Sequence, residues 1–326
     1  MSTNQPVRRL PQLARMPRGV IHVPNLFRCL ANGDRARSHQ TVWTPGDLRI
    51  RYDGPLLGVP ELRVLQGLLS LVKRRGQAKQ PPKERYMDRI AILSGRNAVR
   101  VQTTYAELAR IIGFKGGSVA KRIDASLDLL HATSIEAWEV NHRRKRMAHM
   151  VRRIPGGDKA SLELELAAVL ALGALGQRGD YVRLDLNEVR ALKSDNARLL
   201  HQRLHWINAG DSKIVKLDTL VEYVYPDETQ SAAVRRMRRR RVRSALNEIR
   251  DILHWTIEEE DAKHVCITRP EPPKRSAKGQ RVRVRAAEAE QADDAEQYEQ
   301  YEQYEQYEQY EQYEQYEQYE QYEPAE

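Results

Sequence analysis

Residues 104–123 read T-Y-A-E-L-A-R-I-I-G-F-K-G-G-S-V-A-K-R-I, and this segment predicts two short helices joined by a glycine turn. Thr104 and Glu107 have the spacing of a capping box, which starts a helix, and Gly113 is the residue type that ends one. Ser118 can cap the helix that follows. The apolar stripe of this second helix comprises Val119, Ile123, Leu127 and Leu130.

Two strands are predicted directly after these helices. Residues 134–140 and 147–154 mix apolar and polar side chains, and the turn between them, His142–Arg146, is strongly basic. A helix, a tight turn, a second helix and a basic hairpin follow one another in a winged helix-turn-helix. We therefore expect a first winged-helix domain over residues 21–166, which also contains a helix with the stripe Leu62, Leu65, Leu69 and Val72.

The same order recurs downstream. Residues 217–224 predict a short helix, and the stripe Val242, Leu246, Ile249 and Leu253 predicts a long one, followed by strands at 255–259 and 263–268. The segment L-H-A-T-S-I-E (130–136) matches L-H-W-T-I-E (253–258) with one residue skipped. This repeat predicts a second winged-helix domain over residues 167–270. The expected fold class is α+β and helix-rich, with the two winged helices in tandem.

The charge is divided unevenly between the segments. Of 54 basic and 45 acidic residues, 15 acidic and no basic ones lie from Glu288 onward, so residues 1–287 carry 54 basic and 30 acidic residues and a net charge of +24. Residues 1–20 are expected to be a flexible basic arm and residues 271–287 a basic linker. A body this basic favours a polyanion as its partner.

Residues 288–326 form an acidic tail built on a repeated Glu-Gln-Tyr triplet. Tyrosine at every third position drifts by about 60° per triplet around a helix and makes no continuous apolar seam, so we expect disorder. Two interpretations stay open. The tail is either an inert expansion or a competitor that folds back onto an arginine-rich helix and displaces DNA.

Cysteine content and hydropathy indicate the compartment. Cys29 and Cys266 cannot build a disulfide framework, and residues 1–20 lack the apolar region of a secretory signal. The longest apolar run, Leu166–Gly176, is too short for the roughly 20 residues that span a bilayer. We expect a soluble, cytoplasmic protein that has no membrane partner.

The strongest candidate site is the run Arg235–Arg243, in which seven of nine residues are arginine. The planar guanidinium can bind phosphate bidentately or read guanine in a major groove. The run lies at the recognition-helix position, although a solvated helix face or a localisation tag is the alternative. The predicted DNA contacts are Arg235, Arg236, Arg238, Arg239, Arg240, Arg241 and Arg243.

The first domain offers weaker candidates. Ser118, Lys121 and Arg122 lie on the solvent side of their helix, where ordinary surface charge explains them nearly as well. The basic turn is placed at the expected wing tip, and a wing tip contacts phosphate or the minor groove. Its candidate residues are Arg143, Arg144, Lys145 and Arg146.

Signals for catalysis are weak. His201 and His205 share a helix face, as in a zinc site, but Gln202 replaces the metalloprotease glutamate and no third ligand is evident. No phosphate-binding loop of the Walker type occurs, and no His-apolar-His pair for a nicking enzyme. We expect no catalysis, no cofactor and no metal.

Five strings in the second half are long or specific enough to compare with known families: N-E-V-R-A-L (187–192), A-R-L-L-H-Q-R-L (197–204), D-T-L (218–220), R-V-R-S-A-L (241–246) and I-T-R-P (267–270). Through these strings the second half resembles the replication protein C (RepC) initiators of IncQ-type plasmids. The first half is looser, with Leu26-Phe27-Arg28 and L-R-V-L-Q-G-L (62–68) matching. The acidic tail has no counterpart in that family.

The resemblance implies a function. Such initiators consist of two winged helices, bind direct repeats (iterons) at the vegetative origin and promote opening of an AT-rich region, where the plasmid helicase and primase load. It also places Arg236, Arg238, Arg239, Arg241 and Arg243 where the family has basic residues. We predict that neutralising Arg238 and Arg239 together abolishes origin binding.

Other functions and assembly states stay open at this stage. A winged-helix transcriptional repressor that does not melt DNA is the main alternative, and a nucleic-acid chaperone held by charge alone is a more remote one. Whether the active form is a monomer or a homodimer is likewise open.

Overall fold

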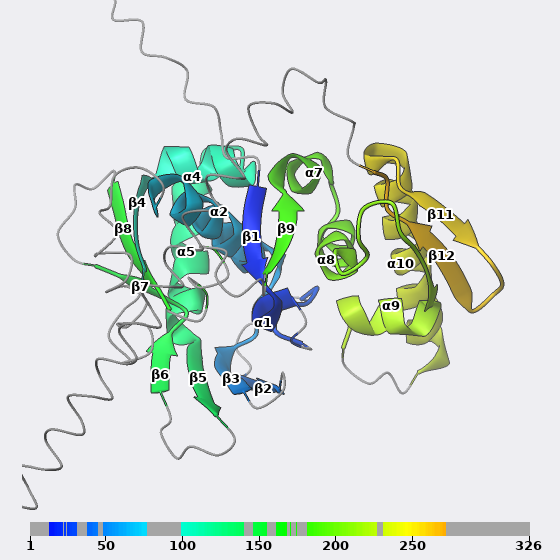
Figure 1. Ribbon diagram of the computed structural model, residues 1–326, viewed down its shortest axis with the longest axis horizontal. Coiled ribbons are helices and arrows are strands. Elements are labelled where there is room, and N and C mark those ends of the chain that lie inside the picture. The colour runs from blue at the N-terminus through cyan, green and yellow to red at the C-terminus, as the bar shows by residue number, and fades with distance from the viewer. Residues whose placement is uncertain are drawn as a thin grey trace, which may run out of the picture. The chain divides into compact units, whose positions relative to one another are not determined.

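A computed structural model describes residues 13–271, except 22, 24, 31–37, 45–47, 77–98, 140–145, 155–160, 168–169, 171–173, 175–180 and 227–230 (Figure 1). The described residues up to Pro270 belong to one compact unit of helices and antiparallel sheets, which confirms the mixed fold class. The predicted linker and tail lie outside the described residues except for Glu271, so the disorder of the tail stays a prediction. The boundary between residues 166 and 167 also stays a prediction.

The first half contains a helix, a strand, two helices and, after two intervening strands that belong to another sheet, two further strands. Its elements are α2 (Val59–Gly76), β4 (Val99–Thr104), α4 (Tyr105–Ile112), α5 (Val119–Ala132), β7 (Val151–Arg153) and β8 (Ser161–Leu166). The strands form an antiparallel sheet in the order β4-β8-β7. The last of these strands, β8, therefore lies between β4 and β7.

Capping residues explain where α4 and α5 begin and end. The hydroxyl of Thr104 accepts a hydrogen bond from the backbone N–H of Glu107 at 3.1 Å, as predicted. Gly113 ends α4 in the left-handed conformation, with φ 70°, which glycine adopts at little cost. Ser118 stands at the N-cap of α5, but its side chain makes no capping bond, because its backbone (φ −99°, ψ 19°) is not extended.

The second half repeats this succession. Its elements are α8 (Asp195–Leu204), β10 (Ser212–Lys216), α9 (Leu217–Val224), α10 (Ala232–Leu253), β11 (Thr256–Glu259) and β12 (His264–Thr268). The sheet order is β10-β12-β11, so the third strand is again central. The two halves therefore share the sheet order and the order of these elements, except that the first half has two additional strands between α5 and β7.

The predicted basic hairpin is part of a larger sheet. Strands β2 (Ser38–Trp43), β3 (Leu48–Pro55), β5 (Ser134–Glu139) and β6 (Arg146–His149) form a sheet in the order β2-β3-β5-β6. The strand predicted over 147–154 is divided at Met150, which is buried and whose N–H binds the carbonyl of Thr133 at 2.9 Å. The chain therefore leaves the four-stranded sheet and enters the sheet of β4 and β8 as β7.

A strand near the N-terminus corrects the prediction of a flexible arm over residues 1–20. β1 (Leu13–Pro17) pairs with β9 (Tyr181–Asp185), with Arg15 opposite Arg183, and leads into α1 (Arg18–Ile21). Ala14 and Met16 are fully buried, and this alternation fixes the strand against the core. Residues 1–12 lie outside the described residues. After β9 the chain forms α7 (Leu186–Ala191).

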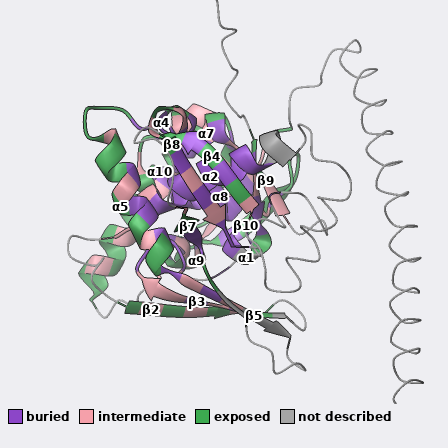
Figure 2. Cartoon of the chain, turned by 90° about the vertical axis from the view of Figure 1, so that its left-hand side faces the viewer, coloured by how far each residue is buried: buried purple, intermediate pink, exposed green. Residues whose placement is uncertain are grey.

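Helix α2 lies at the centre of the core. Every residue from Glu61 to Val72 is buried, not only the predicted stripe, because β1, α4, α5 and α8 all contact this helix (Figure 2). Two of its buried polar side chains bond to other elements: Glu61 accepts from Ser126 at 3.1 Å, and Gln66 donates to Gln202 at 2.8 Å. Within the described part of the chain, no helix combines the length and the apolar character needed to cross a membrane.

Candidate nucleic-acid interface

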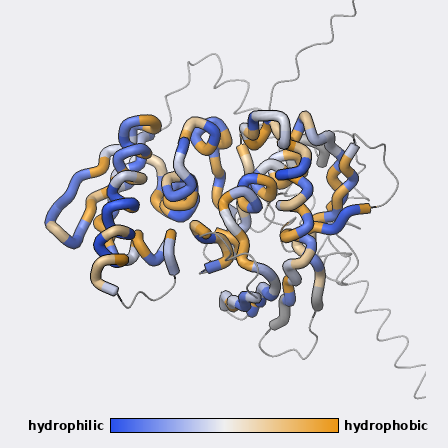
Figure 3. The backbone as a smooth tube through the Cα atoms, turned by 180° about the vertical axis from the view of Figure 1, so that it is seen from behind, coloured by the Kyte–Doolittle hydropathy of each residue, from blue (hydrophilic) through white to orange (hydrophobic). Residues whose placement is uncertain are grey.

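The arginine run occupies the first half of α10, which buries nothing. No residue between Ala232 and Arg241 is buried, whereas the second half buries Val242, Ala245, Leu246 and Ile249. The helix therefore starts as a polar extension and only then packs against the core, and Figure 3 shows it as the hydrophilic vertical coil at the left. Core packing therefore does not explain why the first half of α10 is helical.

Two of the candidate arginines are held by acidic partners. Arg239 makes a bidentate ion pair with Asp218, with Nε–Oδ1 at 2.8 Å and Nη2–Oδ2 at 2.7 Å. The hydrogen bonds from Arg239 lower the pKa of the Asp218 carboxyl. Arg243 binds Glu259 of β11 at 2.8 Å. These two side chains are oriented, and their charge is partly neutralised.

Aromatic contacts orient other arginines. The guanidinium of Arg238 lies over the ring of Tyr225 at 5.1 Å. Burial raises the pKa of Tyr225, and a hydrogen bond with Arg241 opposes that shift. Arg235 is exposed at the start of the helix.

Arg236 and Arg240 differ from these neighbours. Both are exposed, and among the described residues neither forms an ion pair. At about 100° per residue, Arg240 lies about 160° around the helix from Val242, so it points away from the core. Ser244 and Asn247 are exposed on the same side. We call Arg236, Arg240, Ser244 and Asn247 the outer row of α10.

The α5 candidates lie on a face of mixed charge. Ser118, Lys121 and Arg122 are exposed, and Arg122 stacks over the ring of Phe114 at 4.2 Å. Two acids of the same helix, Asp124 and Asp128, contact Arg153 of β7 at 2.7 and 3.5 Å. The outward face of α5 is therefore much less positive than that of α10.

The predicted basic turn connects two strands of the four-stranded sheet. Arg143, Arg144 and Lys145 lie outside the described residues, and Arg146 begins β6, which pairs with β5. The strands that complete the sheet of β4 are β7 and β8. The wing position of the basic turn and DNA contact by its four residues both stay predictions.

The β11–β12 hairpin carries acids at its tip. Glu258, Glu259, Glu260 and Asp261 are exposed, and the Asp261 carboxylate accepts hydrogen bonds from the backbone N–H of His264 and from its ring. Such a tip would repel phosphate. The acidic run is visible in the sequence, but its position beside the arginine helix is not.

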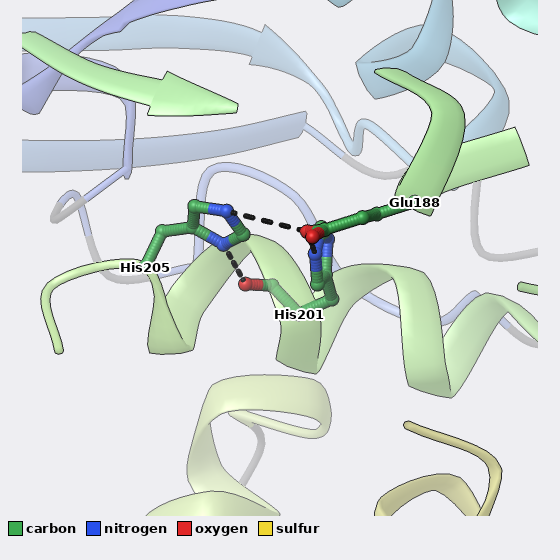
Figure 4. Close-up of side chains that lie close together, drawn as sticks. All are labelled: Glu188, His201 and His205. Atoms are coloured by element: carbon green, nitrogen blue, oxygen red, sulfur yellow. Dashed lines mark hydrogen bonds and ion pairs between the residues drawn. The ribbon is translucent and has the colours of Figure 1, made fainter. Parts of the chain in front are cut away.

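The structure also supplies a third group for the histidine pair. His201 and His205 of α8 are fully buried, and Glu188 of α7 approaches both, with its Oε2 2.7 Å from His201 Nε2 (Figure 4). The sequence alone showed no third ligand for the two histidines, and the structure supplies Glu188. Glu188 was missed because it precedes the pair by 13 residues and is brought back by the turn between α7 and α8.

The family described as "Replication protein C (RepC)" matches residues 12–271, which is most of the chain. The chain belongs to the RepC family. This match confirms the resemblance that the sequence strings indicated, and it extends through the first half, where the strings were looser. As a RepC family member, the chain is a replication initiator.

Solved structures resemble this RepC family member in fold. A crystal structure of domains 2 and 3 of RctB is 11% identical, covers 74% of this chain and 93% of its own, and has a TM-score of 0.50. A second structure, of RctB residues 155–483, is 12% identical with a TM-score of 0.47. No curated protein matches the sequence significantly. At this identity the likeness concerns the fold alone.

Proposed function

We propose that the chain is a non-enzymatic initiator that binds double-stranded direct repeats at a plasmid origin and reads them mainly through α10. Binding promotes opening of an AT-rich region, where the plasmid helicase and primase load. The observation that carries this proposal is the first half of α10, which presents an arginine run to solvent and buries none of it. RepC membership supplies the replication context.

Both halves are proposed to be winged helices. In each, two helices follow the first strand, and the last two strands form a hairpin whose second strand is central in the sheet. We therefore propose α5 and α10 as the recognition helices, because in a helix-turn-helix the second of the two helices enters the major groove. The charge on their outward faces differs, so we assign sequence reading to α10 and a weaker, supporting contact to α5.

We assign the arginines of α10 to two groups according to whether an acidic side chain binds them. The outer row combines two arginines, a serine and an asparagine, which are side chains that pair with guanine or adenine edges. Arg239 and Arg243, each fixed to an acid, would instead meet the phosphates beside the groove. The acidic tip of the β11–β12 hairpin stays clear of the backbone because like charges repel.

The double variant Arg236→Ala/Arg240→Ala tests this assignment. Two lost base contacts are expected to weaken binding to a fragment carrying the plasmid's own origin by at least about 30-fold, since each is worth roughly 1–3 kcal/mol. Binding to an unrelated fragment should fall much less. A gel-shift titration at fixed salt measures both.

The matched control is Lys213→Ala/Arg250→Ala, which removes the same charge from exposed positions of β10 and the end of α10. Equal losses in the two double variants would show that α10 contributes charge alone, and would contradict the assignment. Permanganate reactivity of the AT-rich segment separates an initiator, which melts it, from a repressor, which leaves it paired.

A further inference from the structure

Glu188, His201 and His205 bring three potential metal ligands together where α7 and α8 meet. Their ligand atoms all lie within 4.8 Å of one another (Figure 4). Both histidines project from one face of α8, and α7 supplies the carboxylate. Packing of two helices therefore holds the three side chains in place.

The hydrogen bond of His205 fixes its tautomer. Its Nδ1 lies 2.7 Å from the backbone carbonyl of His201, and a carbonyl oxygen only accepts, so Nδ1 carries the proton. Nε2 then has a lone pair, is buried and has no hydrogen-bond partner among the described residues. It lies 3.9 Å from Oε2 of Glu188, which is also an acceptor. A lone pair and a carboxylate facing each other favour a cation between them.

The surroundings of these groups are closed to solvent on the histidine side. The side chains of His201 and His205 are fully buried, and the carboxylate of Glu188 approaches both from α7. Imidazole and carboxylate are groups that bind a metal ion.

We propose that Glu188, His201 and His205 form a zinc site. Imidazole nitrogen and carboxylate oxygen are zinc ligands at about 2.0–2.2 Å, and two histidines with one glutamate are a known zinc set. The carbonyl of His201 orients His205 in the way that outer partners orient ligating histidines. His201 would carry its proton on Nδ1, and water on the partly exposed side of Glu188 would complete the coordination.

The neighbouring Arg269 gives the proposal a distinctive signature. Its guanidinium lies over the ring of Trp255 at 5.7 Å, and that ring lies 5.7 and 5.9 Å from the rings of His201 and His205. Its charge opposes a dication in the site. Arg269→Gln should therefore tighten zinc binding, an effect that a merely packed histidine pair would not show.

The test uses the full chain, stripped of metal and titrated with Co²⁺ and then with Zn²⁺ against a chromogenic chelator. We expect one ion per chain, visible Co²⁺ absorption and loss of that absorption on adding Zn²⁺. Glu188→Gln and His205→Gln should each weaken binding by more than about tenfold, since changes in outer partners alone cost roughly 10–100-fold. Glu188 is partly exposed, so its variant keeps the test valid should His205→Gln fail to fold.

The control is His149→Gln. His131 and His149 stack at 4.3 Å on the surface and are another place where two imidazoles could bind an ion. Affinity lost with His149→Gln but kept with Glu188→Gln would overturn the proposal. An affinity unaffected by both, or no binding by the original chain, would overturn it as well.

Discussion

At the scale of single residues, adjacent arginines of α10 have different surroundings. Asp218 holds Arg239, Tyr225 lies under Arg238, and Arg240 points outward. The sequence predicted that the run contacts DNA but gave all seven arginines the same role. The partners of these arginines are Asp218 of α9, Tyr225, which follows α9, and Glu259 of β11. No spacing within the run could have revealed them.

The buried histidines predict a pH dependence of stability. The folded pKa of His201 is about 3, below its ordinary value, so the unfolded chain binds the proton first as the pH falls. The metal-free protein should therefore be fully stable above about pH 6.5 and lose roughly 2 kcal/mol from His201 alone by pH 5, with a further loss from His205. Urea unfolding at pH 7 and pH 5 measures this. A His201→Gln variant should lose less between these values, and an equal loss would assign the effect to other groups.

At the scale of elements, a glycine of α2 lets α4 pack closely against this helix. A Cβ at Gly67 would lie 2.5 Å from Cγ2 of Ile112 and 2.8 Å from Cδ1 of Leu108. Gly67→Ala gains up to about 1 kcal/mol of helix propensity, yet overpacking typically costs 1–3 kcal/mol, so we expect net destabilisation. Thermal unfolding checks it against Gly117→Ala, where a Cβ meets nothing within 4 Å. A higher melting temperature for Gly67→Ala would show that α4 shifts freely.

The elements predicted correctly are those with local signals. Thr104 and Gly113 bound α4 as their residue types indicated, and the stripe of α10 is buried from Val242 onward. Strands β1 and β3 were missed because they pair with β9 and β5, which lie far along the chain. The basic hairpin was predicted as a hairpin, but which sheet it joins depends on β3, and its sequence carries no sign of that choice.

At the scale of the whole molecule, a buried polar junction joins segments from both ends of the folded region. Arg203 of α8 donates to the backbone carbonyls of Ile21 and Val23, the latter at 2.8 Å. Gln202 accepts from Gln66 of α2. The two similar units are therefore connected by buried hydrogen bonds, although the repeat in the sequence suggested a division between them.

Arg203→Met tests this junction. The change leaves two carbonyls without their partner, and an unsatisfied buried group costs about 1–3 kcal/mol, so a loss of roughly 2–6 kcal/mol is expected. Unfolding followed by far-UV circular dichroism and by tryptophan fluorescence should shift to lower urea together. A shift in only one signal would show that the two units unfold separately.

The pairing of β1 with β9 also has a consequence for synthesis of the chain. Arg15 leaves the ribosome long before its partner, Arg183, because 168 positions separate them. At about 5–20 residues per second, β1 waits roughly 8–34 s before the other strand is made. During that interval Ala14 and Met16 lack the neighbour that covers them, so a nascent chain stalled before residue 181 should be the form most dependent on chaperones.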